Sequence, residues 1–227
     1  MANISFKNIG ITGMAAAVPK NTIDNYKYTA FFSEADVKEI VDKVGIKERR
    51  FAPEGMCASD LCFAAAEQLI SDLEIDKDEI ELIVFGSQTP DYRMPATSIT
   101  LQHRLGLGKH VAAFDVSLGC SAFVYGLSII YGLMQSGGFR KALLLDGETR
   151  SRIYSPKDRK TAFLFGDGGV AAIIEQNEKF EDSHFSLNSD GALANLIKVD
   201  AGGYRNPSSM ETLTEKVVDE HGNIRTD

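Results

Sequence analysis

Short apolar runs alternate along the chain with longer segments that have a helical period. The short runs, bounded by glycine or charged residues, predict strands, and the longer segments predict helices. This alternation favours βαβ units, hence an α/β protein with a parallel sheet and helices on both faces. The predicted strands cover residues 4–12, 82–86, 111–116, 142–146 and 170–175, and the predicted helices cover residues 33–44, 59–73, 97–105 and 120–136.

The helix boundaries have recognisable residues. Ser33 is a suitable N-cap, and Glu34 and Asp36 place negative charge in the first turn, where the helix dipole favours it. Pro95 comes shortly before the helix predicted to begin at residue 97. A Gly137-Gly138 pair ends the helix predicted over residues 120–136.

The segment 120–136 is apolar nearly all round, with few polar residues on any side. Such a helix is expected to be buried on all faces. One sheet covers only one face of a helix, so a second α/β half or a second subunit must cover the rest.

The composition changes after about residue 176, and the remainder is polar with only short apolar runs at residues 184–187 and 196–199. We expect a domain with the candidate nucleophile over residues 1–176, and the beginning of a second, similar half over residues 177–227, apparently truncated. The alternative is a long surface extension of the first domain. His221 and Asn223 lie in a charged stretch that predicts a hairpin turn.

Length and charge narrow the class of protein. A chain of 227 residues, 44% hydrophobic and 25% charged, can bury a large core without disulfides or metals. The net charge of −8 and the lack of a polybasic run argue against a nucleic-acid or anionic-membrane surface. No apolar stretch reaches the ~18 residues of a membrane span, and the N-terminus does not resemble a signal peptide. These features predict a cytoplasmic protein.

Three cysteines, Cys57, Cys62 and Cys120, show no paired metal-ligand spacing, so no metal site is predicted. Cys120 differs from the others because it follows Gly119 between a predicted strand and a predicted helix. A helix N-terminus there would stabilise a thiolate, and its free N–H groups would hold the oxyanion of an attacked thioester. The alternative is an inert packing cysteine, which is the commoner role for a free cysteine.

Five segments, in order along the chain, resemble the 3-oxoacyl-[acyl-carrier-protein] synthase III family of the thiolase superfamily. They are GIKERR at residues 45–50, PATS at 95–98, FDVSLGCSAF at 114–123, DR at 158–159 and FGDGG at 165–169. The resemblance implies a thiolase-like fold with α/β/α/β/α layers when complete, and a mixed, mostly parallel sheet in each half.

The resemblance also implies a condensing enzyme of fatty acid or related acyl-chain biosynthesis. The cysteine accepts an acyl group, and malonyl-acyl-carrier-protein then loses carbon dioxide and attacks the acyl-enzyme. No cofactor is implied, because acyl-coenzyme A or the acyl carrier protein delivers the substrates. The implied partners are the acyl carrier protein and a second copy of the chain, in a homodimer.

Carried over residue by residue, Cys120 matches the nucleophile and Arg159 matches an arginine that stacks on the coenzyme A adenine. Met94 sits where family members insert a side chain across the dimer interface into the partner's acyl pocket. Phe165 and Gly166 begin the loop that brackets the active site. Apart from Cys120, each of these residues could instead be an ordinary loop or packing residue.

Two departures from the family pattern stand out. The family often has a tryptophan facing the arginine across the adenine, whereas this chain has no tryptophan and places Glu39 or Ile40 there. Acyl delivery on a carrier protein is therefore a real alternative to coenzyme A. The family's histidine and asparagine, which polarise the malonyl thioester, lie in the second half, farther downstream than this chain extends.

Two other functions stay open. One is a superfamily acyltransferase without decarboxylation, or an enzyme like hydroxymethylglutaryl-coenzyme A synthase, which uses a comparable cysteine. The other is a truncated, non-catalytic partner chain that only packs against another subunit.

Overall fold

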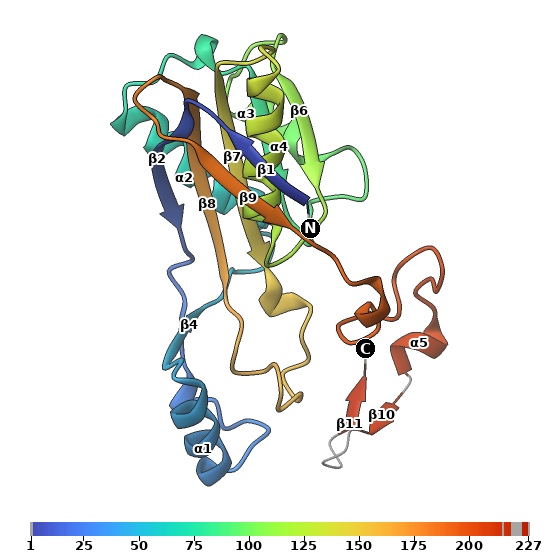
Figure 1. Cartoon of the computed structure of the whole chain (residues 1–227). Helices are drawn as coiled ribbons and strands as arrows, with labels where there is room; N and C mark the ends of the chain where they lie inside the picture. Colours follow the sequence, from blue (N-terminus) through green and yellow to red (C-terminus); the bar gives the residue numbers. More distant parts are fainter. Residues whose placement is uncertain (1, 215, 219–223, 227) are drawn as a thin grey trace. The chain divides into compact units, whose positions relative to one another are not determined.

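A computed structural model describes residues 2–214, 216–218 and 224–226 of the chain. The chain divides into two compact units, and each is described by itself (Figure 1). The first, which we call the sheet unit, comprises Met1–Asn21, Arg50–Thr149 and Asp167–Leu187. The second, the smaller unit, comprises Thr22–Arg49, Arg150–Gly166 and Asn188–Asp227.

A five-stranded mixed sheet forms the centre of the sheet unit, with the strand order β2-β8-β7-β5-β6. The pairs β7/β5 and β5/β6 are parallel, whereas β2/β8 and β8/β7 are antiparallel. The five strands are β2 (Ile9–Ala17), β5 (Leu82–Gly86), β6 (Ala112–Val116), β7 (Lys141–Thr149) and β8 (Asp167–Gln176).

Helices α2 (Ala58–Asp72) and α3 (Thr97–Arg104) cover one face of this sheet. Alternate sheet residues such as Ile83 and Phe85 point into this layer and are completely buried. Burying a side chain of this size contributes about 2–3 kcal/mol to stability. Gly169 of β8 lets α2 lie close to the sheet, because a Cβ added there would lie 2.5 Å from the backbone nitrogen of Cys62.

Helix α4 (Ala122–Gln135) packs on the other face, together with the two-stranded antiparallel ribbon of β1 (Ala2–Phe6) and β9 (Ser183–Leu187). Phe6, Tyr131 and Phe185 form a cluster of edge-to-face rings with centroids 5.4–5.8 Å apart. Such pairs add about 1 kcal/mol each beyond their buried area. The ribbon is therefore fixed to the C-terminal half of α4.

The smaller unit contains α1 (Glu34–Val44) and the antiparallel pair β3 (Thr22–Asp24) and β4 (Glu48–Arg50). Asn25 is buried, and its side-chain amide donates to the carbonyls of Ile46 and Phe163. The remaining short elements of the chain are α5 (Met210–Thr214), the pair β10 (Lys216–Val218) and β11 (Ile224–Thr226), and the 3-10 turns Asn25–Lys27, Lys77–Glu79, Arg150–Arg152 and Gly191–Leu193.

The four predicted helices are confirmed to within about two residues at each end, and Ser33 caps α1 as predicted. The first predicted strand, residues 4–12, is wrong as a single element. The chain breaks between β1 and β2 at Asn8, whose φ of 57° is incompatible with a continuous strand. The sheet is mixed, as predicted, but parallel pairing does not predominate. The apolar run at residues 196–199 forms no strand, and the predicted turn at His221 and Asn223 lies outside the described residues.

The covering of helix α4 by a second half or a second subunit stays a prediction. Within this chain the helix is not buried on all faces, because the side chains of Val124 and Ile129 are 47% and 36% exposed. Strand β6 is only partly buried along its whole length. Helix α4 and strand β6 belong to the same side of the sheet unit, and β6 forms the edge of the sheet.

Two further findings concern membranes and metal ions. No helix in the described part of the chain has the length and apolar character required to cross a membrane. Among the same residues, no three histidine, cysteine, aspartate or glutamate side chains gather as metal ligands would.

Candidate active site

Cys120 lies in the turn between β6 and α4, at the carboxyl end of a parallel strand, and it is exposed. The turn is tight: the Leu118 N–H donates to the Val116 carbonyl at 3.0 Å and the Ala122 N–H donates to the Gly119 carbonyl at 2.8 Å. Open α/β sheets bind ligands at this edge. The structure thus places Cys120 beside the start of α4 with its side chain exposed, and its role as nucleophile stays a prediction.

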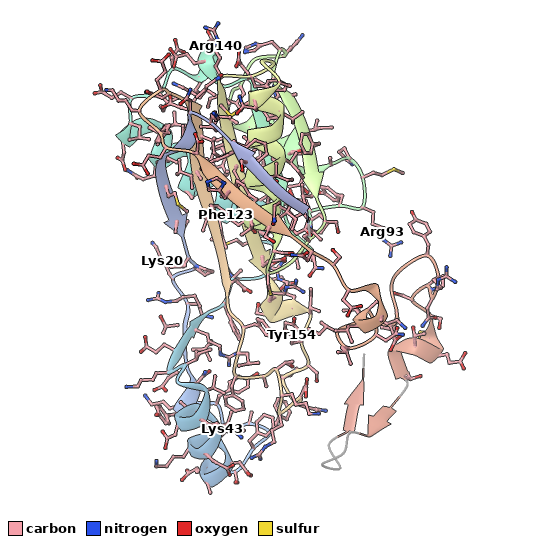
Figure 2. The ribbon with its side chains drawn as sticks, viewed as in Figure 1. Lys20, Lys43, Arg93, Phe123, Arg140 and Tyr154 are labelled. Atoms are coloured by element: carbon pink, nitrogen blue, oxygen red, sulfur yellow. The ribbon has the colours of Figure 1, made fainter. Side chains whose placement is uncertain are left out.

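Among the residues that the structure describes, no side chain closes the amino end of α4. Its N-cap residue, Ser121, makes no side-chain capping hydrogen bond. The helix dipole and the N–H groups of Phe123 and Val124 are therefore available to an anion beside Cys120, whereas the Ala122 N–H is used by the Gly119 carbonyl. Figure 2 labels Phe123, which belongs to this first turn.

The other long helices of the chain differ in this respect. Ser33 accepts from the Asp36 N–H at the start of α1. The carboxylate of Asp60 accepts from the Cys57 N–H at the start of α2, at 2.8 Å. The carboxylate of Asp115, on β6, accepts from the first two N–H groups of α3 at 2.7 and 2.8 Å. Side chains thus occupy the amino ends of these helices.

Two further carboxylates, those of Asp146 and Glu148, lie near the carboxyl end of β7, the strand that pairs with β5. Glu148 accepts from the Gln88 N–H at 2.9 Å and from the Thr89 hydroxyl at 2.6 Å. Partial burial, with the nearby charge of Glu148, raises the pKa of the Asp146 carboxyl to about 6. No role was predicted for Asp115, Asp146 or Glu148. Their common signal is a carboxylate at the carboxyl end of a predicted strand.

Cys62, in contrast to the exposed Cys120, has a buried thiol. It lies in α2 with its side chain completely buried against the sheet. Desolvation is the main reason that the pKa of its thiol is raised to about 12. Cys62 is therefore inert at neutral pH.

Met94 belongs to the loop before α3 in the sheet unit, and its side chain is 81% exposed. The neighbouring Tyr92 is also exposed, at 67%. Two large side chains of one loop are thus exposed. The predicted role of Met94 at a dimer interface stays a prediction.

Arg159 belongs to the smaller unit, where α1 engages its guanidinium. It donates to the Asp36 carboxylate at 2.6 Å, and its other terminal nitrogen lies 3.8 Å from Glu39. The hydrogen bond from Arg159, aided by one from Ser33, holds the pKa of the Asp36 carboxyl below its ordinary value. A shallow hollow of about 200 Å³ lies beside them, lined by Glu39, Ile40, Lys43, Val44, Arg159 and Lys160.

Phe165 and Gly166 also belong to the smaller unit. The Phe165 ring stacks on Tyr154, labelled in Figure 2, with centroids 4.5 Å apart. Arg49 donates to the Phe165 carbonyl at 3.1 Å. These contacts fix the loop within its unit. The five predicted site residues thus divide into Cys120 and Met94 in the sheet unit and Arg159, Phe165 and Gly166 in the smaller unit.

Comparisons with known proteins agree with the motifs. Residues 114–202 match the family model of 3-oxoacyl-[acyl-carrier-protein] synthase III. The chain is 36% identical over 211 residues to the beta-ketoacyl-[acyl-carrier-protein] synthase III of Fusobacterium nucleatum, covering 92% of this chain and 64% of that relative. It is 38% identical over 221 residues to the enzyme of the same name from Aliarcobacter butzleri, covering 96% of this chain and 64% of that relative.

Solved structures support the same fold. A 3-oxoacyl-(acyl-carrier protein) synthase from Burkholderia xenovorans superposes with a TM-score of 0.87 at 34% identity, covering 89% of this chain and 58% of that one. A 3-oxoacyl-[acyl-carrier-protein] synthase III from Aquifex aeolicus gives 0.72 at 28% identity, covering 96% and 64%. These matches confirm the resemblance to the synthase III family and the thiolase-like α/β fold. The chain spans about three-fifths of the length of the curated relatives it matches.

Proposed function

We propose that this chain is the nucleophile-bearing part of a 3-oxoacyl-acyl-carrier-protein synthase III, a condensing enzyme of fatty acid or related acyl-chain biosynthesis. The observation that carries the proposal is the exposure of Cys120 beside the uncapped amino end of α4, at the carboxyl end of β6. The proposal is supported by the relatives of that name, which are 34–38% identical to this chain over the aligned 211–221 residues. No cofactor takes part beyond the carriers of the substrates.

The first chemical step is acyl transfer. The Cys120 thiolate attacks the carbonyl carbon of an acyl thioester and forms a carbon–sulfur bond. The carbonyl oxygen becomes an oxyanion, which free N–H groups at the start of α4 stabilise. When the tetrahedral intermediate collapses, the carrier's sulfur leaves as a thiolate and takes up a proton. The products are acyl-Cys120 and the free carrier thiol.

The second step is condensation. Malonyl-acyl-carrier-protein loses carbon dioxide, and the resulting carbanion attacks the acyl-Cys120 carbonyl. A carbon–carbon bond forms, the bond to sulfur breaks, and 3-oxoacyl-acyl-carrier-protein leaves. By family resemblance this step uses a histidine and an asparagine that the similar segments of this chain do not include. We therefore assign acyl transfer to Cys120, and condensation to the protein as a whole.

Acylation of Cys120 tests the first step. The chain is incubated with acyl-coenzyme A or acyl-carrier-protein, and intact-protein mass spectrometry measures the added acyl group. We expect one acyl group on the parent chain, one on Cys57→Ala as the matched control, and none on Cys120→Ala. Acylation of Cys120→Ala to the same extent as the parent would refute the proposal. Release of radiolabelled carbon dioxide from malonyl-acyl-carrier-protein tests the second step.

For the acyl donor, we propose the acyl carrier protein in preference to coenzyme A. In the smaller unit, the guanidinium of Arg159 is engaged by Asp36 and lies near Glu39, so its charge is already neutralised. The Glu39 carboxylate would also repel the phosphates of a nucleotide carrier. The same acyl group is offered on each carrier and the acylation rates are compared. A higher rate with coenzyme A in the parent chain would contradict this choice.

The organisation of the protein completes the proposal. We propose that residues 1–176 form the first thiolase-like half and that residues 177–227 begin the second, with the five-layered architecture arising when both are complete. We further propose a homodimer with Met94 at its interface, Phe165 and Gly166 beside the substrate, and a cytoplasmic location. Analytical ultracentrifugation of the parent and of Met94→Ala tests the dimer.

A further inference from the structure

Arg49 is a charged residue in the interior of the smaller unit. It belongs to β4 and is 6% exposed. Its Nε donates to the Asn25 side-chain oxygen at 2.6 Å, and its Nη1 donates to the Phe165 carbonyl at 3.1 Å. The guanidinium carbon also lies 5.1 Å from the centre of the Tyr28 ring. Because burying a guanidinium removes its hydration, these contacts have to compensate for the loss.

Asn25 extends the contacts of Arg49 along the same loop. It is completely buried, and its amide nitrogen donates to the Ile46 carbonyl at 2.9 Å and to the Phe163 carbonyl at 3.1 Å. Its side-chain oxygen is the acceptor for Arg49. The two side chains thus form one hydrogen-bonded pair, which holds the carbonyls of two alternate residues, Phe163 and Phe165.

Phe163 and Phe165 depend on this pair to different degrees. The Phe163 ring is 1% exposed and packs in an apolar cluster with residues of α1, so the ring itself fixes this residue. Phe165 is only half-buried, and its ring stacks on Tyr154 (Figure 2). The hydrogen bond from Arg49 ties the Phe165 backbone to β4, one residue before Gly166.

The shape of the guanidinium gives this contact its precision. The group is planar, and its Nε and Nη1 donate in fixed directions to two different acceptors. Arg49 therefore fixes the Phe165 carbonyl relative to Asn25. A lysine ammonium is a single point charge, so a change from arginine to lysine keeps the charge and removes this constraint.

We propose that Arg49 is a positioning residue for the acyl donor: it sets the place of Phe165 and Gly166, and these two residues bind the substrate. The inference rests on the proposed function, which puts Phe165 and Gly166 beside the substrate. Arg49 acts through the loop and not on the reacting atoms. Loss of its contacts therefore weakens binding of the acyl donor more than it slows the attack of the Cys120 thiolate.

The test measures the rate of acylation by intact-protein mass spectrometry over a series of acyl-donor concentrations. The donor is acyl-carrier-protein or acyl-coenzyme A, whichever acylates the parent chain faster. The maximal rate and the half-saturating concentration are compared for the parent, Arg49→Lys and Arg49→Gln. Arg49→Gln removes the charge and so leaves no uncompensated charge buried, which keeps the test available if Arg49→Lys does not fold.

Arg50→Lys is the matched control. Arg50 is the exposed neighbour of Arg49, and its guanidinium donates to the Pro19 and Lys20 carbonyls at 3.3 and 3.2 Å. The same substitution thus falls on the next residue without touching the loop that contains Phe165. Circular dichroism confirms that each variant is folded.

For both Arg49 variants we expect the half-saturating concentration to rise about three- to tenfold, with the maximal rate within about twofold of the parent. Arg50→Lys should follow the parent. In a Phe165→Ala background, Arg49→Lys should change the half-saturating concentration by less than about twofold, because the ring that Arg49 positions is absent.

An unchanged half-saturating concentration in the Arg49 variants overturns the inference, whatever happens to the maximal rate. An equal rise in Arg50→Lys also overturns it. So does a rise of full size in the Phe165→Ala background, because the effect would then not pass through Phe165. If the parent chain itself is not acylated, the proposed function is refuted, and this inference with it.

Discussion

The two faces of the central sheet are filled in different ways. The face under α2 and α3 is closed, with Ile83, Phe85 and Leu143 completely buried. The face under α4 has a buried core around Ile130 and Met134, but its outer residues and the edge strand β6 stay partly open. The same sheet thus has one face that this chain completes and one that it does not.

The cysteines follow the same division. Cys62, on the closed face, has a thiol whose pKa burial raises to about 12, whereas Cys120, at the start of the helix on the open face, is exposed. Carboxylates occupy the amino ends of α2 and α3, while no side chain caps α4. The face under α2 and α3 therefore has a buried thiol and capped helix ends. The exposed thiol and the helix end without a capping side chain lie on the α4 side.

The largest expected effect is in thiol reactivity. In the folded chain at pH 8, we expect iodoacetamide to alkylate Cys120 at least about 1,000-fold faster than Cys62, because a thiol with a pKa near 12 is almost entirely protonated there. Peptide mass spectrometry gives both rates in one sample. In 8 M urea, the two rates should converge. Equal rates in the folded chain would remove the distinction between the faces.

A matched pair of isoleucines tests the packing difference. Ile83 is completely buried on the closed face, and Ile129 on α4 is 36% exposed. We expect Ile83→Ala to lower the free energy of unfolding by about 2–5 kcal/mol, and Ile129→Ala by less than about 1 kcal/mol. Urea denaturation measures both. If Ile129→Ala costs as much as Ile83→Ala, α4 is as tightly packed as the closed face.

Gly147 tests how closely α2 lies on the sheet. An added Cβ would lie 2.6 Å from the Cys62 sulfur and 3.1 Å from the Gly168 carbonyl oxygen. We expect Gly147→Ala to destabilise the chain by about 1–3 kcal/mol. Adding Cys62→Ala should recover part of this loss, since it removes the nearer atom. A double variant no more stable than the single one would place the strain at the backbone of β8 instead.

Asp146 gives the smallest expected effect, with a sign that depends on pH. Its folded pKa of about 6 lies above the ordinary value of 3.8. The folded chain therefore holds the proton more tightly than the unfolded chain, and the free energy of unfolding falls as pH rises from 4 through 6. Because the group is partly solvated, we expect Asp146→Asn to raise the free energy of unfolding by only about 1 kcal/mol at pH 7, and to leave it unchanged at pH 4. Denaturation at both pH values checks this. A gain of equal size at pH 4 would assign the effect to packing.

Local patterns were sufficient for most of the helices and strands in the two units. The helical period and Ser33 located α1, and the apolar run at residues 82–86 gave the bounds of β5. The break at Asn8 was missed because both flanking segments are apolar and only the backbone angle separates them. The antiparallel insertion of β8 between β2 and β7 was also missed, since strand order depends on long-range pairing.

The candidate site was only partly accessible from the sequence. Cys120 was found because a glycine-containing turn between a strand and a helix is a local signal. The engagement of Arg159 by Asp36 was not foreseen, because the two residues are 123 positions apart and meet only in the folded chain. The hydrogen bonds from Asn25 and Arg49 to the carbonyls of Phe163 and Phe165 were missed for the same reason.

The amino-acid sequence by itself determined the α/β class, the helix boundaries and the cysteine that follows a strand, because these depend on period, capping residues and turn chemistry within short stretches. Tertiary structure decided which cysteine is buried and which is exposed, and which helix end lacks a cap. Solvation and long-range pairing set those properties, and both arise only when distant segments pack together.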